Sequence, residues 1–240
     1  MTGSDARVSE RQAARIAGYA YLAIAGLSIF ANFFVRVRLI EPDDAAATAG
    51  NIMDSETLFR IGLLSFLIVF VLDVVVAWAL YLFFKPINTD VSLLTAWFRL
   101  TYAVLFGGAL VFFFALELVS GADYLGAFET GQREAQVTLY LDAFNDLWLI
   151  GLLCFGIHLA LLGYLILESG HIPTALGILL VLAGTAYVIN TLANTLLSNY
   201  DDYEAVFVTI VAVPSVIGEL AFPIWLLLRG GKEPLALPAA

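Results

Sequence analysis

Six long apolar runs limit what this chain can fold into more than any other feature of the sequence. They cover residues 14–35, 58–84, 92–119, 141–167, 174–198 and 205–228. A helix of about 20 apolar residues crosses a hydrocarbon core of about 30 Å, so each run is long enough to span a membrane. With 61% hydrophobic and only 13% charged residues, the chain has the composition of an integral membrane protein. We therefore predict an all-α fold, a polytopic transmembrane bundle of six helices.

The distribution of Lys and Arg predicts the orientation, because short cytoplasmic flanks carry an excess of both residues. Six spans place both termini on one side, which then holds Arg7, Arg11, Arg15, Lys85, Arg229 and Lys232. The opposite side holds Arg36, Arg38 and Arg133. We expect a cytoplasmic N-terminal segment at 1–13, a six-helix membrane domain at 14–228 and a cytoplasmic C-terminal tail at 229–240. The predicted location is the cell (plasma) membrane, with several passes.

Two of the outer loops carry helix signals of their own. Asp43 or Asp44 can cap a short Ala-rich helix, which we expect at 43–52. The loop before the fourth span ends in helix-favouring residues, so that span is expected to begin as early as Gln132. The remaining loops are short, which makes sequential helices antiparallel neighbours.

Several function classes are disfavoured by what the chain lacks. A net charge of -10 argues against a nucleic-acid partner. Cys154 stands alone, so the sequence offers neither a disulfide framework nor a cysteine metal site. The chain has no His-x-x-x-His, Gly-x-Ser-x-Gly or phosphate-loop motif. We predict no metal and no cofactor. The expected partners are the lipid bilayer and a small hydrophobic or amphipathic ligand.

Ionisable residues inside the spans carry the main functional signal. Asp73, Arg99, His158 and Glu219 lie on four different predicted helices. Counted at 1.5 Å per residue from the cytoplasmic ends, they fall within about 6 Å of each other in depth. Intramembrane charges are costly and need a partner or an aqueous cavity. We call these residues the inner polar layer.

The inner polar layer has two interpretations. It can be a functional site: an acid/base group, a proton relay or a pocket for a polar headgroup. It can equally be an interhelical clamp in which Arg99 pairs with Asp73 or Glu219, because polar ties hold membrane helices together. Pro214 and Pro223 flank Glu219 and each removes a backbone hydrogen bond, so we expect a kink and freed carbonyls beside this acid.

A second, outer polar layer is expected nearer the opposite side of the membrane. Tyr187, Asn190 and Asn194 follow helical spacing on one face of the fifth span, together with Thr191, Thr195 and Ser198. Asp142, Asn145 and Asp146 share a face of the fourth span, and Arg60 lies near the outer end of the second. The two faces could line a wet cleft or form a hydrogen-bonded seam. The fourth span therefore joins both layers.

The ordering of these features resembles the domain of unknown function 4386 family, which comprises prokaryotic six-helix integral membrane proteins. The matching stretches are RQAARIAGYAYL, PDDAAATAGNI followed by ETLFRIG, LDVVVAWALY, AWFRL, FGIHLALLGYLILESGHIPTALGILLVLAG and GELAFPIWLL. The likeness covers nearly the whole chain and implies the six-helix fold. It places Arg60, Asp73, Arg99, His158 and Glu219 within shared motifs. It brings no activity with it.

Three classes of function remain open at this point. The first is a membrane protein that binds or passes a small ligand, ion or proton through its polar interior. The second is an intramembrane enzyme acting on a lipid or isoprenoid-like substrate, with Glu219 or Asp73 as general acid and His158 as partner. The third is a structural subunit whose polar layers are clamps. The first leads, since it requires no catalytic geometry.

Overall fold

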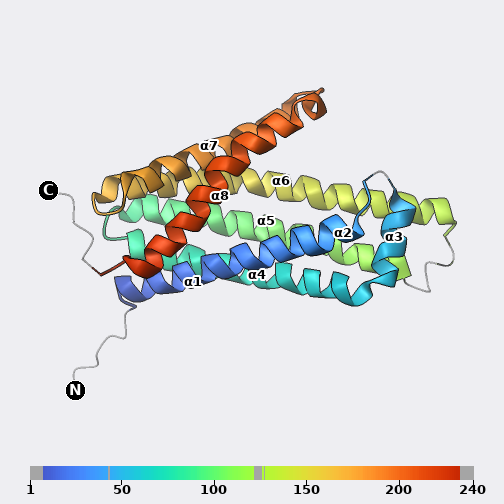
Figure 1. The fold of residues 1–240 in the computed structure, drawn as a ribbon, viewed down its shortest axis with the longest axis horizontal. Coiled ribbons are helices and arrows are strands. Elements are labelled where there is room, and N and C mark those ends of the chain that lie inside the picture. The colour runs from blue at the N-terminus through green and yellow to red at the C-terminus, as the bar shows by residue number, and fades with distance from the viewer. Residues whose placement is uncertain (1–7, 43, 122–125, 127, 233–240) are drawn as a thin grey trace, which may run out of the picture. The chain divides into compact units, whose positions relative to one another are not determined.

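A computed structural model confirms the all-α fold with six helices long and apolar enough to cross a membrane (Figure 1). The structure describes residues 8–42, 44–121, 126 and 128–232. The first spanning segment combines α1 (Glu10–Ile29), the π-helix η1 (Phe30–Arg36) and α2 (Val37–Leu39). The other elements are α3 (Ala45–Asp54), α4 (Glu56–Phe84), α5 (Thr89–Gly121), α6 (Thr130–Ser169), α7 (Thr174–Leu196), η3 (Tyr200–Asp202) and α8 (Glu204–Leu228).

The local signals in the outer loops correspond to observed helix ends. Asp44 is the N-cap of α3, and its side chain accepts a hydrogen bond from the backbone N–H of Ala47. That helix spans Ala45–Asp54, close to the predicted 43–52, while Asp43 lies outside the described residues. Helix α6 begins at Thr130, two residues before the early start that was expected. Caps and helix-favouring residues act locally, which is why the sequence alone predicted both features.

The chain divides into two compact units, and the helices α1, α4, α5 and α6 run through both. One unit, which we call the charged unit, contains residues 1–22, 73–102 and 152–240. The other, the aromatic unit, contains residues 23–72 and 103–151. The aromatic unit is filled by rings that pack at centroid distances between 4.8 and 6.3 Å. Its rings include Phe59, Phe66, Phe106, Phe113, Phe144 and Trp148.

Within the charged unit, α6 and α7 pack so closely that their backbones touch. A Cβ atom on Gly163 would lie 2.6 Å from the carbonyl oxygen of Gly177, and one on Gly156 would lie 2.7 Å from that of Gly184. Seven residues separate the two glycines of each helix, which is about two turns, so each pair lies on one face. Small residues of this kind let membrane helices approach closely. This contact fixes α7 against the half of α6 that carries His158.

Helix α8 runs through Pro214 and Pro223 without a break from Glu204 to Leu228. Proline has no backbone N–H, so the carbonyl oxygens four residues earlier, those of Ile210 and Glu219, lose their usual helical donor. The second of these carbonyls therefore belongs to the acid of the inner polar layer. The freed carbonyl that was predicted beside Glu219 is therefore the backbone carbonyl of Glu219 itself.

The cytoplasmic end of α8, as oriented by the sequence, is held by α1. Arg11 donates hydrogen bonds to the carbonyl oxygens of Gly230 at 2.6 Å, Leu227 at 3.0 Å and Leu226 at 3.4 Å. Gly231 has a φ of 62°, a left-handed conformation that glycine adopts without strain, and it turns the chain back towards Arg11. A cation that binds the last carbonyls of a helix also interacts favourably with the helix dipole.

We expect Arg11→Gln to loosen the end of α8 without unfolding the protein. Hydrogen bonds to a charged group contribute about 1.5–3 kcal/mol, and this change removes them from the carbonyls at the end of α8. Hydrogen–deuterium exchange should therefore speed up in residues 225–232 of the purified protein. The exposed Arg15 of the same helix is the matched control, and Arg15→Gln should leave that exchange unchanged. Equal exchange in both variants would contradict the role of Arg11.

Candidate functional site

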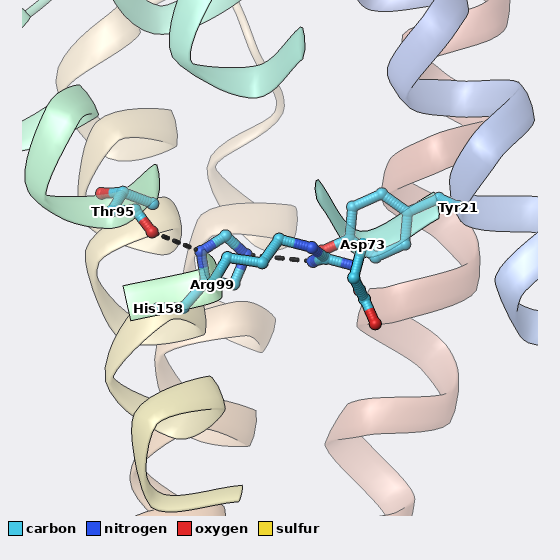
Figure 2. A network of polar contacts seen from close by, with 5 residues as sticks. All are labelled: Tyr21, Asp73, Thr95, Arg99 and His158. Atoms are coloured by element: carbon cyan, nitrogen blue, oxygen red, sulfur yellow. Dashed lines mark hydrogen bonds and ion pairs between the residues drawn. The ribbon is translucent and has the colours of Figure 1, made fainter. Parts of the chain in front are cut away.

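Arg99 of α5 lies at the centre of a buried polar network in the charged unit (Figure 2). Its side chain is only 1% exposed. Nη2 donates to Asp73 Oδ1 of α4 at 2.5 Å, and Nη1 donates to the Tyr21 hydroxyl of α1 at 2.5 Å. Nη1 also lies 3.2 Å from His158 Nε2 of α6. The network therefore ties four helices together around one guanidinium.

The partners of His158 determine which of its ring nitrogens carries the proton. A guanidinium can only donate hydrogen bonds, so Nε2, which faces Arg99, must be the acceptor. Nδ1 lies 2.9 Å from the backbone carbonyl oxygen of Thr95 and must donate to it. His158 is therefore a neutral imidazole with its proton on Nδ1. Thr95 and Arg99 lie four residues apart on α5, one turn of the same face, and so hold both sides of the ring.

Aromatic rings complete the surroundings of the guanidinium. The Arg99 Cζ atom lies 4.3 Å from the ring centroid of Tyr21 and 5.5 Å from that of Phe155. Cations placed over such rings are attracted by the negative ring faces, most strongly where water is absent. Phe155 in turn stacks on His158 at 5.9 Å and meets the edge of Tyr187 at 5.5 Å. The sequence carries no signal that distinguishes Tyr21 or Phe155, because aromatic residues are common in every span.

Glu219 of α8 is linked to this network less directly. Its closest hydrogen-bond donor is the Tyr187 hydroxyl, at 3.5 Å from Oε1. The buried Ser215 hydroxyl lies beside both groups but makes no hydrogen bond of regular geometry with a described residue. Arg99 interacts with Glu219 electrostatically, while its ion pair is formed with Asp73. Of the two acids that could pair with Arg99, the structure selects Asp73.

Hydrogen-bonding capacity remains unused even inside the ion pair. Asp73 Oδ2 and Arg99 Nε are buried and have no hydrogen-bond partner among the described residues. Buried polar atoms without a partner are rare in proteins and often mark a bound water, an ion or a site of chemistry. Asp73, Arg99 and His158 thus form a buried polar cluster with one tight ion pair, and Glu219 interacts with the Arg99 charge without pairing with it.

The residues of the predicted outer polar layer make separate contacts in the structure. Tyr187 belongs with Glu219 and the inner network rather than with the outer residues. Asn190 accepts a hydrogen bond from the Tyr200 hydroxyl at 2.8 Å, and Asn194 is exposed. Arg60 is exposed and forms an ion pair of 2.6 Å with Glu56 of its own helix.

The predicted polar face of α6 lies in the aromatic unit. Asp142, Asn145 and Asp146 are all exposed there, and Asn145 Oδ1 accepts a hydrogen bond from Arg36 at 2.8 Å. The polar face of α7 belongs to the charged unit. Whether these two faces meet therefore stays a prediction. In the sequence Arg36 counted only as a charge that flanks the first span, whereas in the structure it contacts Asn145.

Comparison with known sequences assigns the chain to a family. A family model described as "Domain of unknown function (DUF4386)" matches residues 16–230. The protein is a member of the DUF4386 family. An uncharacterised protein of Archaeoglobus fulgidus is 30% identical over 165 residues, which cover 69% of this chain and 81% of that relative. No solved structure matches the chain. The family assignment confirms the predicted resemblance, and this DUF4386 member carries its polar network within the matched region.

Proposed function

We propose that this DUF4386 protein binds a proton or a small cation at Glu219, within the membrane, as part of binding or passing it through the polar interior. The observation that supports this most strongly is the division of roles between the two acids. Asp73 takes the ion pair with Arg99, whereas Glu219 accepts a long hydrogen bond from the neutral Tyr187 hydroxyl and forms no ion pair with a described residue. An acid at membrane depth without a charged partner of its own must hold a proton or attract a cation.

A charge count within the inner polar layer leads to the same conclusion. His158 is neutral in its hydrogen-bonded arrangement, so Arg99 provides the positive charge that faces Asp73 and Glu219. One guanidinium neutralises one carboxylate. If Glu219 were also ionised, the layer would carry an excess negative charge in a medium that solvates charge poorly. A bound proton or cation removes that excess.

The surroundings of Glu219 favour a small positively charged guest. The carbonyl oxygen of Glu219 lacks its usual donor because Pro223 follows four residues later. The Tyr187 and Ser215 hydroxyls lie beside the carboxyl group. Glu219 itself is partly exposed, unlike Asp73, Arg99 and His158, which are fully buried. Oxygen atoms gathered around a carboxyl group are what a proton or a small cation requires.

The tight Asp73–Arg99 pair fits a structural clamp, and this role is compatible with the proposal. The network of α1, α4, α5 and α6 holds the guanidinium in place, so that its field acts on Glu219 from a fixed position. We further propose that the protein resides in the plasma membrane with both termini in the cytoplasm, as the distribution of Lys and Arg predicts. Glu219 would then lie nearer the cytoplasmic face.

The Glu219 site is tested by Glu219→Gln, which keeps the shape of the side chain and removes its proton chemistry. Infrared spectra of the purified protein at neutral pH, where exposed carboxyl groups are ionised, should show a carboxylic acid band that this variant loses. If Glu219 binds a cation instead, added Na⁺ or K⁺ should raise the thermal unfolding temperature of the wild type. Glu219→Gln should then show no such rise. Glu204→Gln, at the exposed start of the same helix, is the matched control and should behave as the wild type.

Either signal, if lost in Glu219→Gln alone, supports the proposal and tells a proton from a cation. If the wild type and Glu219→Gln give identical spectra and identical cation responses, Glu219 is only a packing residue and the proposal is wrong. Tyr187→Phe provides a further readout, since it removes the hydroxyl that contacts the carboxyl group. It should shift the position of the carboxylic acid band without abolishing it.

A further inference from the structure

A cavity of about 630 Å³ lies in the aromatic unit, apart from the Glu219 site. Its walls come from the end of the first spanning segment, the turn that follows, the start of α3 and the N-terminal third of α6. Ile40, Pro42 and Leu141 give it apolar surface. Pockets for small ligands usually enclose about 300–1,000 Å³ and combine apolar walls with a few polar groups. The cavity therefore has the size and the mixed lining of a binding site.

Charges of both signs line this cavity without pairing with each other. Arg36 is its basic residue, and its hydrogen bonds go to the neutral side-chain oxygens of Asn145 at 2.8 Å and Asn32 at 3.2 Å. It forms no ion pair with any residue in the described part of the chain. Glu41, Asp44, Glu134 and Asp142 also line the cavity. The Asp44 carboxylate caps α3 at the backbone N–H of Ala47, and none of the other three carboxylates is paired with a described residue. Opposite charges that share a cavity but stay apart leave room for a guest that carries both.

Arg36 is held firmly in this position. It ends the π-helix η1, where the N–H of Val37 bonds to the carbonyl oxygen of Asn32 five residues earlier. Turns of this type inside α-helices occur frequently at functional sites. The guanidinium lies over the rings of Phe144 at 4.8 Å and Trp148 at 5.4 Å. An arginine fixed by two amides and two rings is preorganised to receive an anionic group.

The described acids around the cavity are not gathered into one tight cluster. No group of three His, Cys, Asp or Glu side chains in the described part of the chain is close enough to hold a metal ion. Carboxylates spread around a cavity suit a larger cation such as an alkylammonium, which needs several acceptors at greater distances. Three N–H donors of a primary ammonium match this requirement.

We infer that the cavity beside Arg36 binds a zwitterion that carries a primary ammonium and a phosphate, the chemistry of phosphoethanolamine. The phosphate lies against the Arg36 guanidinium, and the ammonium lies among Glu41, Glu134 and Asp142. This group occurs both as a free metabolite and as a lipid headgroup. By topology the cavity faces the side of the membrane opposite to the termini, where either source can reach it.

The test measures binding to the purified full-length protein in detergent by calorimetry, with O-phosphoethanolamine, ethanolamine and inorganic phosphate as probes. The zwitterion should bind more tightly than either half. Loss of one charge-assisted interaction should weaken its binding by about 10- to 100-fold in Arg36→Gln and in Asp142→Asn. Asp142 is exposed, so Asp142→Asn should fold even if Arg36→Gln does not. Arg60→Gln, an exposed arginine outside the cavity, is the matched control and should bind as the wild type.

A second experiment, with lipids, distinguishes a lipid headgroup from a free metabolite as the source of the zwitterion. Native mass spectrometry of protein from mixed phosphatidylethanolamine and phosphatidylglycerol nanodiscs should show selective retention of phosphatidylethanolamine if the guest is a headgroup, and Asp142→Asn should abolish it. Binding of the soluble probe without lipid selectivity supports a free zwitterion. The inference is overturned if neither O-phosphoethanolamine binding nor selective retention of phosphatidylethanolamine is seen. It is also overturned if ethanolamine binds as tightly as the zwitterion, or if Asp142→Asn leaves binding unchanged.

Discussion

Arg99→Gln is expected to lower the free energy of unfolding by about 3–5 kcal/mol, because it leaves a buried charge without its partner. Asp73 would keep its carboxylate in a site that is 1% exposed, and the Tyr21 hydroxyl would lose the guanidinium that donates to it. Unfolding of the detergent-solubilised protein, followed by circular dichroism in a denaturant series, measures the loss. Arg60→Gln removes a more than half-exposed pair of 2.6 Å on α4 and should cost about 0–1 kcal/mol.

A double variant separates the ion pair from simple packing. Asp73→Asn together with Arg99→Gln removes both charges, so it should recover part of the stability lost in Arg99→Gln. The recovery is expected because an unpaired buried charge costs more than a neutral polar pair. If the double variant is less stable than Arg99→Gln by the full cost of Asp73→Asn alone, the two residues act independently and the clamp interpretation is wrong.

The second large effect is expected at the contact between α6 and α7. A Cβ atom at Gly184 would collide with the carbonyl oxygen of Gly156 and lie 2.6 Å from the amide nitrogen of Ala160. Both obstacles are backbone atoms, which cannot move aside as a flexible side chain can. Gly184→Ala should therefore destabilise the protein by about 1–3 kcal/mol, the usual cost of overpacking. Thermal unfolding in detergent is the measurement.

Gly26→Ala is the matched control for this change. Gly26 lies inside α1, and a Cβ atom there would meet nothing within 4 Å. Alanine is favoured over glycine in a helix by about 0.5–1 kcal/mol, so this substitution should leave the stability equal or slightly higher. The same substitution, glycine to alanine, should then lower the stability at Gly184 and leave it equal or raise it at Gly26. Equal effects at Gly26 and Gly184 would contradict the close backbone contact.

Features that depend on a short stretch of chain followed from the sequence. Six apolar runs each satisfied the length of a membrane span, and a helix can cross lipid because its backbone hydrogen bonds all form within the segment. Asp44 begins α3 because a carboxylate can accept from an N–H three residues later. The helical positions of Asp73, Arg99 and His158 indicated similar depths, because the rise of a helix is regular.

Features that depend on which helix faces which were decided by the tertiary structure. Sequence allowed Arg99 to pair with either acid, and the packing of α4 against α5 selected Asp73 and left Glu219 to Tyr187. Depth along a helix is set by residue number, but the direction of a side chain is set by packing between helices. For the same reason, only the folded structure shows the contacts of Tyr21, Phe155 and Arg36. Membrane class and helix number were thus properties of the sequence, whereas the choice of partner for each buried charge required the folded bundle.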